Sequence, residues 1–282
     1  MILSIIILNY NTKDLTLSLL NSLFEKFDKE IQENKIEVIL ADNASSDGSP
    51  TAFKKSKYFS KIILIENKEN FGFSKGNNIA FKNAGGNYTL FLNSDTEVSD
   101  KGFLNMAKFL DEDQEVGIVG GKLINLDGSD QMSAGKFYTI SNLFLMLIGG
   151  ERLGLLRSSP AKITRVDWVS GACLMIRREL FEKLKGFDEN LFMYMEDMEL
   201  CYRARKDGAL TYFYPDIKLI HRELGSGNKN FAILNIYKGI SYFYRKHMKS
   251  KYELATTMLK FKAWILNSIG KEPYGEALKI LR

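Results

Sequence analysis

The chain of 282 residues has only two cysteines, Cys173 and Cys201. Two cysteines are too few for a disulfide framework or a zinc cluster, and each of these lies among apolar neighbours. We therefore expect both to be reduced thiols in the protein core. Internal repeats and low-complexity tracts are also absent from the sequence. These absences favour a globular protein, and the length is sufficient to bury a sizeable core.

Long apolar runs are missing as well. No stretch approaches the roughly 20 apolar residues that a membrane-spanning helix requires. The N-terminal "MILSIIILNYN" lacks the basic start and the small-residue cleavage site of a signal peptide, and it is better explained as a buried strand. We expect a cytoplasmic protein, and leave open whether it touches the inner face of the cell membrane.

The net charge of +5 is spread unevenly along the chain. From about residue 228 onward, aromatic residues alternate with Lys and Arg at helical spacing. Such basic amphipathic helices suit an anionic membrane surface, but they would equally suit a helical appendage with a solvated basic face. No nucleic-acid-binding motif accompanies the basic residues, so we expect no nucleic acid partner. We divide the chain into 1–227 and a basic helical region, 228–282.

The first half of the sequence alternates strand-like and helix-like segments. Strands are predicted in "LSIIILNYN", "IEVILAD", "KIILIEN" and "YTLFLNSD", and helices start near Thr12 and within "SKGNNIAFKNAG", which Gly85-Gly86 would close. This alternation predicts right-handed βαβ units, and therefore an α/β fold with a mostly parallel sheet flanked by helices. Residues 140–157 are apolar without a clean period, and fit either a mobile flap, a patch on a bilayer, or a loop that covers the core.

Three of the predicted strands end in polar clusters. Ligands of parallel α/β sheets lie at the carboxyl ends of the strands, so three clusters at one sheet edge favour a binding site over simple turns. The clusters are Asn9-Tyr10-Asn11, Asp42-Asn43-Ala44-Ser45 and Asn93-Ser94-Asp95. In the third cluster, Asp95 could supply one hard oxygen ligand to a divalent cation. His221 follows an apolar strand-like stretch and is the candidate for a second ligand.

Two further stretches carry candidate chemistry. In "NKENFGFSKGNNIAF", Gly72 and Gly76 would let backbone approach a ligand just before a helix, although the stretch is neither a Walker A nor a Rossmann sequence. In "LFMYMEDMEL", Glu196 and Asp197 begin a helix after an apolar segment. The helix dipole alone would favour acids there, but apolar surroundings could also raise the pKa of one carboxylate toward use as a general base.

Taken in order, these stretches resemble the inverting glycosyltransferases of family 2, which have the GT-A fold. The resemblance covers roughly residues 2–225 and is closest to bacterial rhamnosyltransferase-type enzymes of cell-surface polysaccharide synthesis. It rests on the stretches "SIIILNYN", "ADNASSDGS", "NFGFSKGNN", "LFLNSDTEV", "DWVSGACLMIRRELFEKLKGFDENLFMYMEDMELCYRARKDG" and "HRELGSGN".

The resemblance implies a role for each matching position. A nucleotide-diphosphate sugar would be bound by Asn9, Asn11, Asp42 (at the nucleobase), Asn70, Gly72, Phe73, Asn77, Asn93, Ser94 and Asp95. A glycan or lipid-linked acceptor would lie against Trp168, Gly171, Ala172 and Glu199. Mg²⁺ or Mn²⁺ would be held by Asp95 and His221. Asp197 would be the catalytic base, and Glu196 would shape the contacts to donor sugar and acceptor. Within 1–227, about residues 1–100 would form the nucleotide-sugar half and about 101–227 the acceptor half.

The sequence departs from the family pattern at two positions. Asn93 stands where the metal-binding motif usually begins with Asp, which makes His221 more important for a metal. Glu199 stands where a second Asp usually follows the base, and we expect it to orient the helix or the acceptor. The donor implied first is dTDP-rhamnose. A UDP-hexose or UDP-N-acetylhexosamine donor and a catalytically silent nucleotide-sugar-binding partner remain the alternatives, and the oligomeric state stays open.

Overall fold

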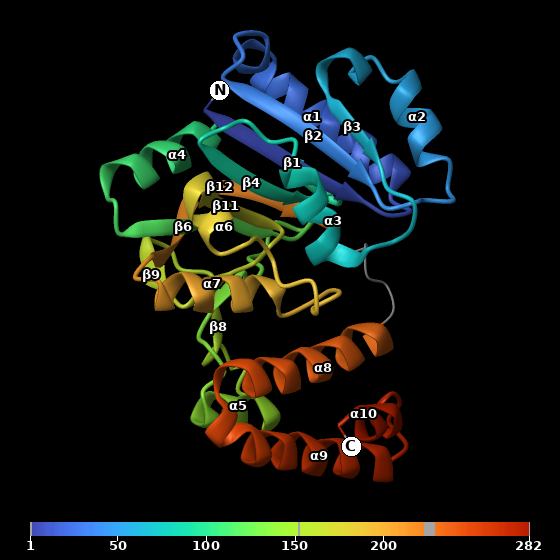
Figure 1. Cartoon of the computed structure of the whole chain (residues 1–282), viewed down its shortest axis with the longest axis vertical. Helices are drawn as coiled ribbons and strands as arrows, with labels where there is room; N and C mark the ends of the chain where they lie inside the picture. The colour runs from blue at the N-terminus through green and yellow to red at the C-terminus, as the bar shows by residue number, and fades with distance from the viewer. Residues whose placement is uncertain (1, 152, 223–228, 282) are drawn as a thin grey trace.

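Nine strands form the central sheet of this computed structural model, which describes residues 2–151, 153–222 and 229–281 (Figure 1). The strand order is β3-β2-β1-β4-β11-β6-β12-β5, with β9 paired to β12. The strands are β1 (Leu3–Asn9), β2 (Ile36–Asp42), β3 (Ile63–Glu66), β4 (Tyr88–Asn93), β5 (Thr96–Val98), β6 (Val116–Ile124), β9 (Thr164–Val166), β11 (Cys173–Arg177) and β12 (Leu210–His221).

A second, three-stranded sheet and the helices complete the described fold. The small sheet has the order β10 (Trp168–Val169), β7 (Ala134–Gly135) and β8 (Arg157–Ser158). The α-helices are α1 (Lys13–Gln32), α2 (Ser49–Lys55), α3 (Gly72–Phe81), α4 (Phe103–Glu112), α5 (Ile140–Leu147), α6 (Arg178–Lys183), α7 (Glu196–Lys206), α8 (Lys229–His247), α9 (Tyr252–Ser268) and α10 (Tyr274–Ile280). Short 3-10 turns cover Phe59–Lys61 and Lys249–Lys251.

The continuous apolar run of β1 follows from burial on both of its faces. Ile5 and Ile7 pack into one hydrophobic cluster, whereas Ile6 faces a second cluster on the other side of the sheet. Side chains alternate along a strand, so both faces must be apolar when helices cover both sides. Burial of each such side chain contributes about 1.5–3 kcal/mol. The strand predicted from this run is confirmed.

The sheet is mostly parallel at the N-terminal half and mixed beyond it. β1 pairs in parallel with β2 and β4, and β2 with β3, as the βαβ pattern predicted. β11 then runs antiparallel between β4 and β6, and β12 pairs in parallel with β6. Through this arrangement β12 also meets β5, where His221 lies opposite Thr96. The sheet thereby brings the end of β12 beside the end of β4.

One detail of the sequence prediction changes, the end of the helix α3. The helix expected to close at Gly85-Gly86 ends earlier, since α3 stops at Phe81. Gly86 instead lies tightly against β1, where a Cβ would come within 2.7 Å of the Ser4 backbone nitrogen. Cys173 and Cys201 are buried and free, as expected.

The helices α5, α8, α9 and α10 form a layer at one end of the molecule (Figure 1). α9 packs against α5, α8 and α10, so a segment from the middle of the chain shares this layer with the C-terminal helices. Of residues 140–157, for which three alternatives were open, 140–147 form a helix with Leu143 and Leu147 buried, and Arg157 begins β8. The division into 1–227 and 228–282 stays a prediction. Among the described residues, no helix has the length and apolarity needed to cross a membrane.

Candidate active site

The three predicted polar clusters lie side by side at one edge of the sheet. Asn9 is opposite Asp42 in the register of β1 and β2, and Leu8 is opposite Asn93 in the register of β1 and β4. The strands are parallel, so their carboxyl ends meet at the same edge. The structure therefore brings the predicted donor residues of all three strand ends together.

Asn9 and Asp42 are hydrogen-bonded to each other below the surface. The Asn9 amide donates to the Asp42 carboxylate at 2.6 Å, and the second Asp42 oxygen accepts the Ser45 backbone N–H at 2.9 Å. Neither Asn9 nor Asp42 is exposed. In this conformation both side chains shape the loops at the strand ends, whereas the adjacent Tyr10 and Asn11 are exposed. Tyr10 carries no role in the sequence prediction, since a lone aromatic in a loop has no distinctive spacing.

Thr12 joins the first and third clusters. Its hydroxyl donates to the side-chain amide oxygen of Asn9 at 2.7 Å and lies 2.8 Å from the Ser94 hydroxyl. Thr16, one turn into α1, donates to the same Asn9 oxygen at 2.8 Å. The start of α1 therefore holds the ends of β1 and β4 in a single arrangement.

The glycine loop at the start of α3 is hydrogen-bonded to Asn43, which directly follows β2 and had no predicted role of its own. Asn43 is buried, and its amide donates to the Gly72 carbonyl oxygen at 3.0 Å. Gly72 has φ +74°, and a Cβ there would lie 2.4 Å from the Phe192 carbonyl oxygen. Asn70 accepts the Gly72 N–H at 3.0 Å, and Asn77 donates to the Phe73 carbonyl oxygen at 2.9 Å. Glycine is required at position 72 because the loop packs directly against the segment that precedes α7.

Asp95 and His221 meet at the ends of β4 and β12. The Asp95 carboxylate lies 3.3 Å from His221 Nε2, and the Asn93 amide lies at the same distance from that nitrogen. Asp95 is nearly completely buried. Carboxylate and imidazole are both ligands of divalent first-row cations, and their separation allows both to contact one ion. The two residues predicted to share a metal are adjacent.

Gln131 orients His221 through two hydrogen bonds. Its amide oxygen lies 2.9 Å from His221 Nδ1, and its amide nitrogen donates to the His221 carbonyl oxygen at 2.7 Å. When Nδ1–H donates to this oxygen, Nε2 keeps its lone pair and faces Asp95. Sequence reasoning did not find Gln131, because it is 90 residues from His221 in a turn-rich stretch.

The pair fits a cation only with additional ligands. Within the described ranges, no group of three or more His, Cys, Asp and Glu side chains could hold a metal. A nucleotide diphosphate and water would have to complete the shell, as hard cations that bridge phosphates commonly require. The remainder of the "HRELGSGN" stretch, 223–228, lies outside the described residues.

Asp197 begins α7 beside Gly171 and Phe73. One carboxylate oxygen accepts the Gly171 N–H at 3.1 Å, and the other accepts the Met198 N–H at 2.7 Å. A Cβ on Gly171 would lie 3.1 Å from the Phe73 ring, so the donor loop and the predicted base are in contact with the same glycine. Burial raises the pKa of Asp197, and these N–H groups together with the charge of Arg157 limit the rise.

Glu196 differs from Asp197 although the two are consecutive. Glu196 is buried, and its Oε2 has no hydrogen-bond partner in the described structure. Burial, and then the negative charge of Asp197, raise the pKa of Glu196 well above its ordinary value. Two neighbouring carboxyls whose environments separate their proton affinities can divide acid and base roles, and here Glu196 is the one whose pKa is raised further.

The two residues before this pair have left-handed backbone. Tyr194 has φ 68° and Met195 has φ 72°. Such conformations cost on the order of 1–3 kcal/mol each in non-glycine residues and cluster at functional sites. Gly239 of α8 makes room for the bend, since a Cβ there would lie 2.8 Å from Met195 Cγ. α8 therefore packs against the turn that presents Asp197.

Trp168 and Ala172 lie deeper than the acceptor prediction implied. Both are buried, and the Trp168 indole donates to the Lys136 carbonyl oxygen at 3.1 Å. The Arg157 guanidinium covers the ring at 5.3 Å from its centroid. Of the four predicted acceptor residues, only Gly171 contacts Asp197. Arg157 was not predicted as part of the site.

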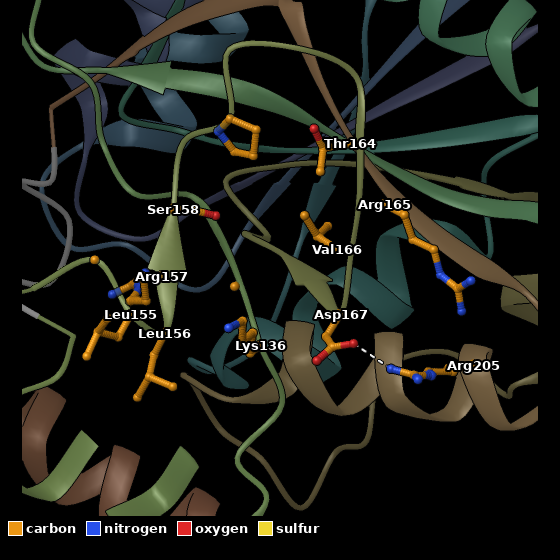
Figure 2. A pocket seen from close by; sticks show the side chains of 13 residues that line it. Lys136, Leu155, Leu156, Arg157, Ser158, Thr164, Arg165, Val166, Asp167 and Arg205 are labelled. Carbon is orange, nitrogen blue, oxygen red and sulfur yellow. Dashed lines mark hydrogen bonds and ion pairs between the residues drawn. The ribbon is translucent and has the colours of Figure 1, made fainter. Parts of the chain in front are cut away.

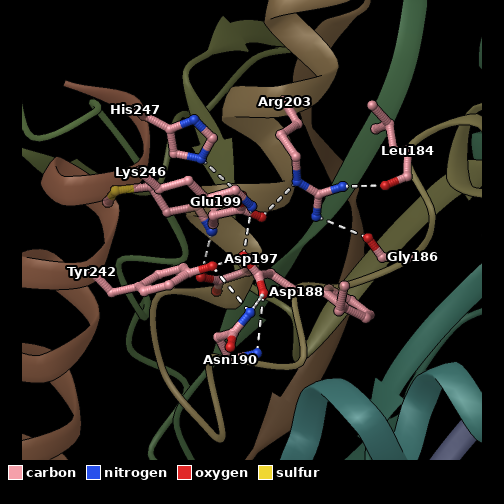
Figure 3. A network of polar contacts seen from close by, with 12 residues as sticks. Leu184, Gly186, Asp188, Asn190, Asp197, Glu199, Arg203, Tyr242, Lys246 and His247 are labelled. Atoms are coloured by element: carbon pink, nitrogen blue, oxygen red, sulfur yellow. Dashed lines mark hydrogen bonds and ion pairs between the residues drawn. The ribbon is translucent and has the colours of Figure 1, made fainter. Parts of the chain in front are cut away.

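Glu199 is the fourth predicted acceptor residue, and it faces α8 instead of the site (Figure 3). Its carboxylate is fully buried and accepts from Arg203 and Lys246 at 2.7 Å and from His247 at 2.9 Å. Burial alone would raise the pKa of Glu199, but the His247 hydrogen bond and the two cations hold it below its ordinary value. This geometry gives the acceptor prediction no support. It favours the other expectation, that Glu199 orients the helix.

Lys246 extends the same network to Asp188. Its ammonium donates to Asp188 at 2.6 Å, and Tyr242 donates to that carboxylate at 2.7 Å (Figure 3). Asp188 lies before the turn that leads into α7, and Glu199 lies within α7. One lysine of α8 thus holds both sides of the turn that carries Asp197.

An open cavity of about 520 Å³ is lined by Arg157, which covers the Trp168 ring, and by residues that carry no predicted role (Figure 2). Arg205 and Asp167, which line it, form an ion pair at 2.5 Å, and Lys136, Arg157 and Arg165 add further positive charge. None of the residues predicted for donor, acceptor or metal lines this cavity. The candidate active site is therefore the sheet edge with Asp95, His221, Gly171 and Asp197.

The family comparison agrees with this geometry. The model of Glycosyl transferase family 2 matches residues 4–185, which include the three strand ends and the glycine loop. The chain belongs to glycosyltransferase family 2. As a member, it is a glycosyltransferase, and its sheet and helices are those of the GT-A fold.

Relatives and solved structures add detail about what this glycosyltransferase resembles. It is 26% identical over 225 residues to the N-acetylglucosaminyl-diphospho-decaprenol L-rhamnosyltransferase of Mycobacterium tuberculosis, covering 71% of each chain. It is 29% identical over 216 residues to the O-antigen biosynthesis protein RfbC of Myxococcus xanthus, covering 74% of this chain but only 16% of that protein. The mannosyltransferase PcManGT of Pyrobaculum calidifontis, solved with GDP-Man and Mn²⁺, shares the fold with a TM-score of 0.61 at 17% identity, over 99% of this chain and 83% of that one.

Proposed function

We propose that this glycosyltransferase moves L-rhamnose from dTDP-rhamnose, with inversion, to a hydroxyl of a lipid-linked or polysaccharide acceptor at the inner face of the cell membrane. The choice of sugar is supported by the resemblance to a mycobacterial rhamnosyltransferase over 71% of both chains. The choice of reaction is supported by one observation about the position of Asp197.

That observation is the contact of Asp197 and Phe73 with the same glycine. The Gly171 N–H binds one oxygen of Asp197, and the Phe73 ring from the donor loop packs against Gly171. A general base must lie within hydrogen-bond reach of the proton that it removes while the donor sugar is held nearby. An acceptor bound over Gly171 would meet both requirements.

The residues of the chain then have distinct tasks. Asp197 takes the proton of the acceptor hydroxyl, and the oxygen forms its bond to the anomeric carbon on the face opposite the leaving diphosphate, which inverts the configuration. The Gly171 N–H keeps the carboxylate aimed at the acceptor. Protonated Glu196, one residue earlier, can donate a hydrogen bond to the sugar or the acceptor without adding a second negative charge.

Asp95 and His221 would hold Mg²⁺ or Mn²⁺. When bound, such a cation neutralises the charge that develops on the leaving diphosphate. Asn93, Ser94 and Thr12 maintain the strand ends around this position. Gln131 fixes the imidazole so that Nε2 faces Asp95.

A thermal-shift screen of nucleotide sugars with and without Mn²⁺ tests this proposal. A stabilisation selective for dTDP-rhamnose and dependent on Mn²⁺, followed by mass spectrometry of rhamnosylated lipid-linked acceptor, is the expected result. Selectivity for UDP sugars would replace the donor and keep the reaction. Binding without donor hydrolysis or transfer to any acceptor would instead identify a silent nucleotide-sugar-binding partner.

A further inference from the structure

The outward face of α9 carries four large apolar side chains, Leu254, Phe261, Trp264 and Ile265. All residues of α9 are described, and beyond Glu253 in the first turn its exposed residues are uncharged: Leu254, Thr257, Phe261, Trp264, Ile265, Asn267 and Ser268. Phe261 is 62% and Trp264 59% exposed, and their rings stack at 6.3 Å. Large aromatic side chains grouped on a surface mark a site of interaction with a membrane or another protein.

A second helix adds to this end of the molecule. α5 packs alongside α9, and Lys262 of α9 donates to the Leu147 carbonyl oxygen at the end of α5 (Figure 1). Phe144 and Ile148 in and just after α5 are exposed as well. We call the exposed apolar residues of these two segments the apolar end: Phe144, Ile148, Leu254, Phe261, Trp264 and Ile265.

Two lysines lie beside the apolar residues of α9. Lys260 and Lys262 flank the stripe on the two sides of α9, by the 100° step between successive residues of a helix. Over 228–282 the sequence has eleven Lys and Arg against three Glu, a net charge of +8, whereas the remaining 227 residues carry −3. The positive charge of the chain is therefore concentrated in the region that contains the apolar stripe of α9.

We propose that the apolar end docks this enzyme onto an anionic bilayer, with Phe261 and Trp264 inserted at the level of the headgroups. An amphipathic helix with Trp, Phe and Leu on one face and flanking lysines lies in the plane of a membrane interface, and anionic lipids attract the lysines. A second copy of the chain would bring two regions of +8 together, so charge complementarity favours the lipid surface. The inference rests on the proposed function, which places transfer at the inner face of the cell membrane, and deepens it by naming the surface that would meet the bilayer.

α8 connects the proposed docking layer to the candidate active site. α8 contacts α9, and its Lys246 and Gly239 contact the segment around the turn that presents Asp197. The layer that faces the bilayer is thus the layer that supports the predicted base.

Flotation with vesicles of phosphatidylethanolamine and phosphatidylglycerol tests the docking surface. The chain has two tryptophans, and the other, Trp168, is buried. We expect the full chain to float with these vesicles and the Trp264 emission to shift to the blue. Binding should be weaker at high salt, which screens the charges, and weaker to vesicles of phosphatidylcholine alone. Phe261→Ser with Trp264→Ser should lower the vesicle affinity by about tenfold or more. Phe59→Ser, at an exposed aromatic outside the apolar end, is the matched control and should bind as the native chain does.

Two outcomes would overturn the proposal. One is a native chain that neither floats nor changes its Trp264 emission. The other is a concentration-dependent dimer in sedimentation velocity that Phe261→Ser with Trp264→Ser abolishes, since it would assign the face to a second copy. Donor binding and transfer to a short soluble acceptor should be unchanged in this double variant. Loss of vesicle binding and failure of the transfer reaction are therefore measured separately.

Discussion

The Gly171 N–H donates to the Asp197 carboxylate at 3.1 Å, although 26 residues separate them along the chain. Gly171 follows β10, and Asp197 lies in the first turn of α7. The hydrogen bond fixes one oxygen of the carboxylate and stabilises its ionised form, against the burial that raises its pKa. The glycine also leaves room for the Phe73 ring. The proposed base and the Phe73 ring therefore both depend on one small residue.

Replacement of the base should abolish transfer while the donor still binds. In Asp197→Asn the carboxamide cannot accept the acceptor proton, so kcat should fall by about a hundred- to ten-thousandfold. The thermal shift caused by the nucleotide sugar should change little, because Asp95 and the donor loop are intact. Unchanged turnover in a single-turnover assay would remove Asp197 as the base.

Addition of one methyl group at Gly171 should impair catalysis more than stability. The Cβ of Gly171→Ala would lie 3.1 Å from the Phe73 ring, so the ring or the backbone must move by a few tenths of an ångström. We expect kcat to fall by about tenfold, or ~1.4 kcal/mol of barrier. Gly85→Ala, whose Cβ would have an ordinary contact of 3.5 Å with Glu37, serves as the control and should keep native kcat.

Loss of the Gln131 amide should weaken metal binding without removal of a ligand. In Gln131→Leu the imidazole of His221 loses the partner that sets its tautomer and orientation. The Mn²⁺ affinity, measured by calorimetry in the presence of nucleotide, should fall by about 10–100-fold. Gln114→Leu, at an exposed position, provides the comparison. Equal affinities in the two variants would contradict the assignment of His221 as a ligand oriented by Gln131.

Glu199 should contribute to stability far more than a surface glutamate in the same type of pair. Glu199 and Arg203 are one helical turn apart at 2.7 Å, as are Arg178 and Glu182 at 2.9 Å, but only the first carboxylate is buried. Glu199→Ala removes the carboxylate that Arg203 and His247 share, both of which are largely buried, and should cost about 3–5 kcal/mol of unfolding free energy. The exposed Glu182→Ala should cost less than about 0.5 kcal/mol in the same urea titration.

Removal of the carboxyl of Glu196 should stabilise the fold at neutral and alkaline pH. Its pKa is raised in the folded state, so its contribution to stability is present at low pH and is lost as pH rises above the ordinary glutamate value. Glu196→Gln should therefore unfold at higher urea concentration near pH 8, by about 1 kcal/mol, with a smaller gain near pH 5. A gain that is equal at both pH values would show that Glu196 does not titrate abnormally. Transfer activity should fall in the same variant, since the amide replaces a carboxyl group within the site.

Some features of this glycosyltransferase could be predicted from its sequence. The continuous apolar run of β1 and the alternation of strands and helices predicted a mostly parallel sheet, because a strand covered on both faces must be apolar on both. The polar residues at the strand ends, Asn9, Asp42 and Asn93, were predicted to meet, because parallel strands end at the same edge. These inferences use local patterns and a rule of topology, and they need no side-chain coordinates.

Tertiary packing alone decided the rest. Nothing in the sequence around Glu199 indicates that Lys246 and His247 neutralise it, and Gln131 reaches His221 only because β12 returns beside β6. The sequence alone also does not show which side of α9 faces the core. The structure shows that Ala255, Leu259 and Ala263 are buried, so the apolar stripe with Phe261 and Trp264 is the exposed side. Helical spacing identifies a face, but its neighbours in space determine whether that face meets protein, water or lipid.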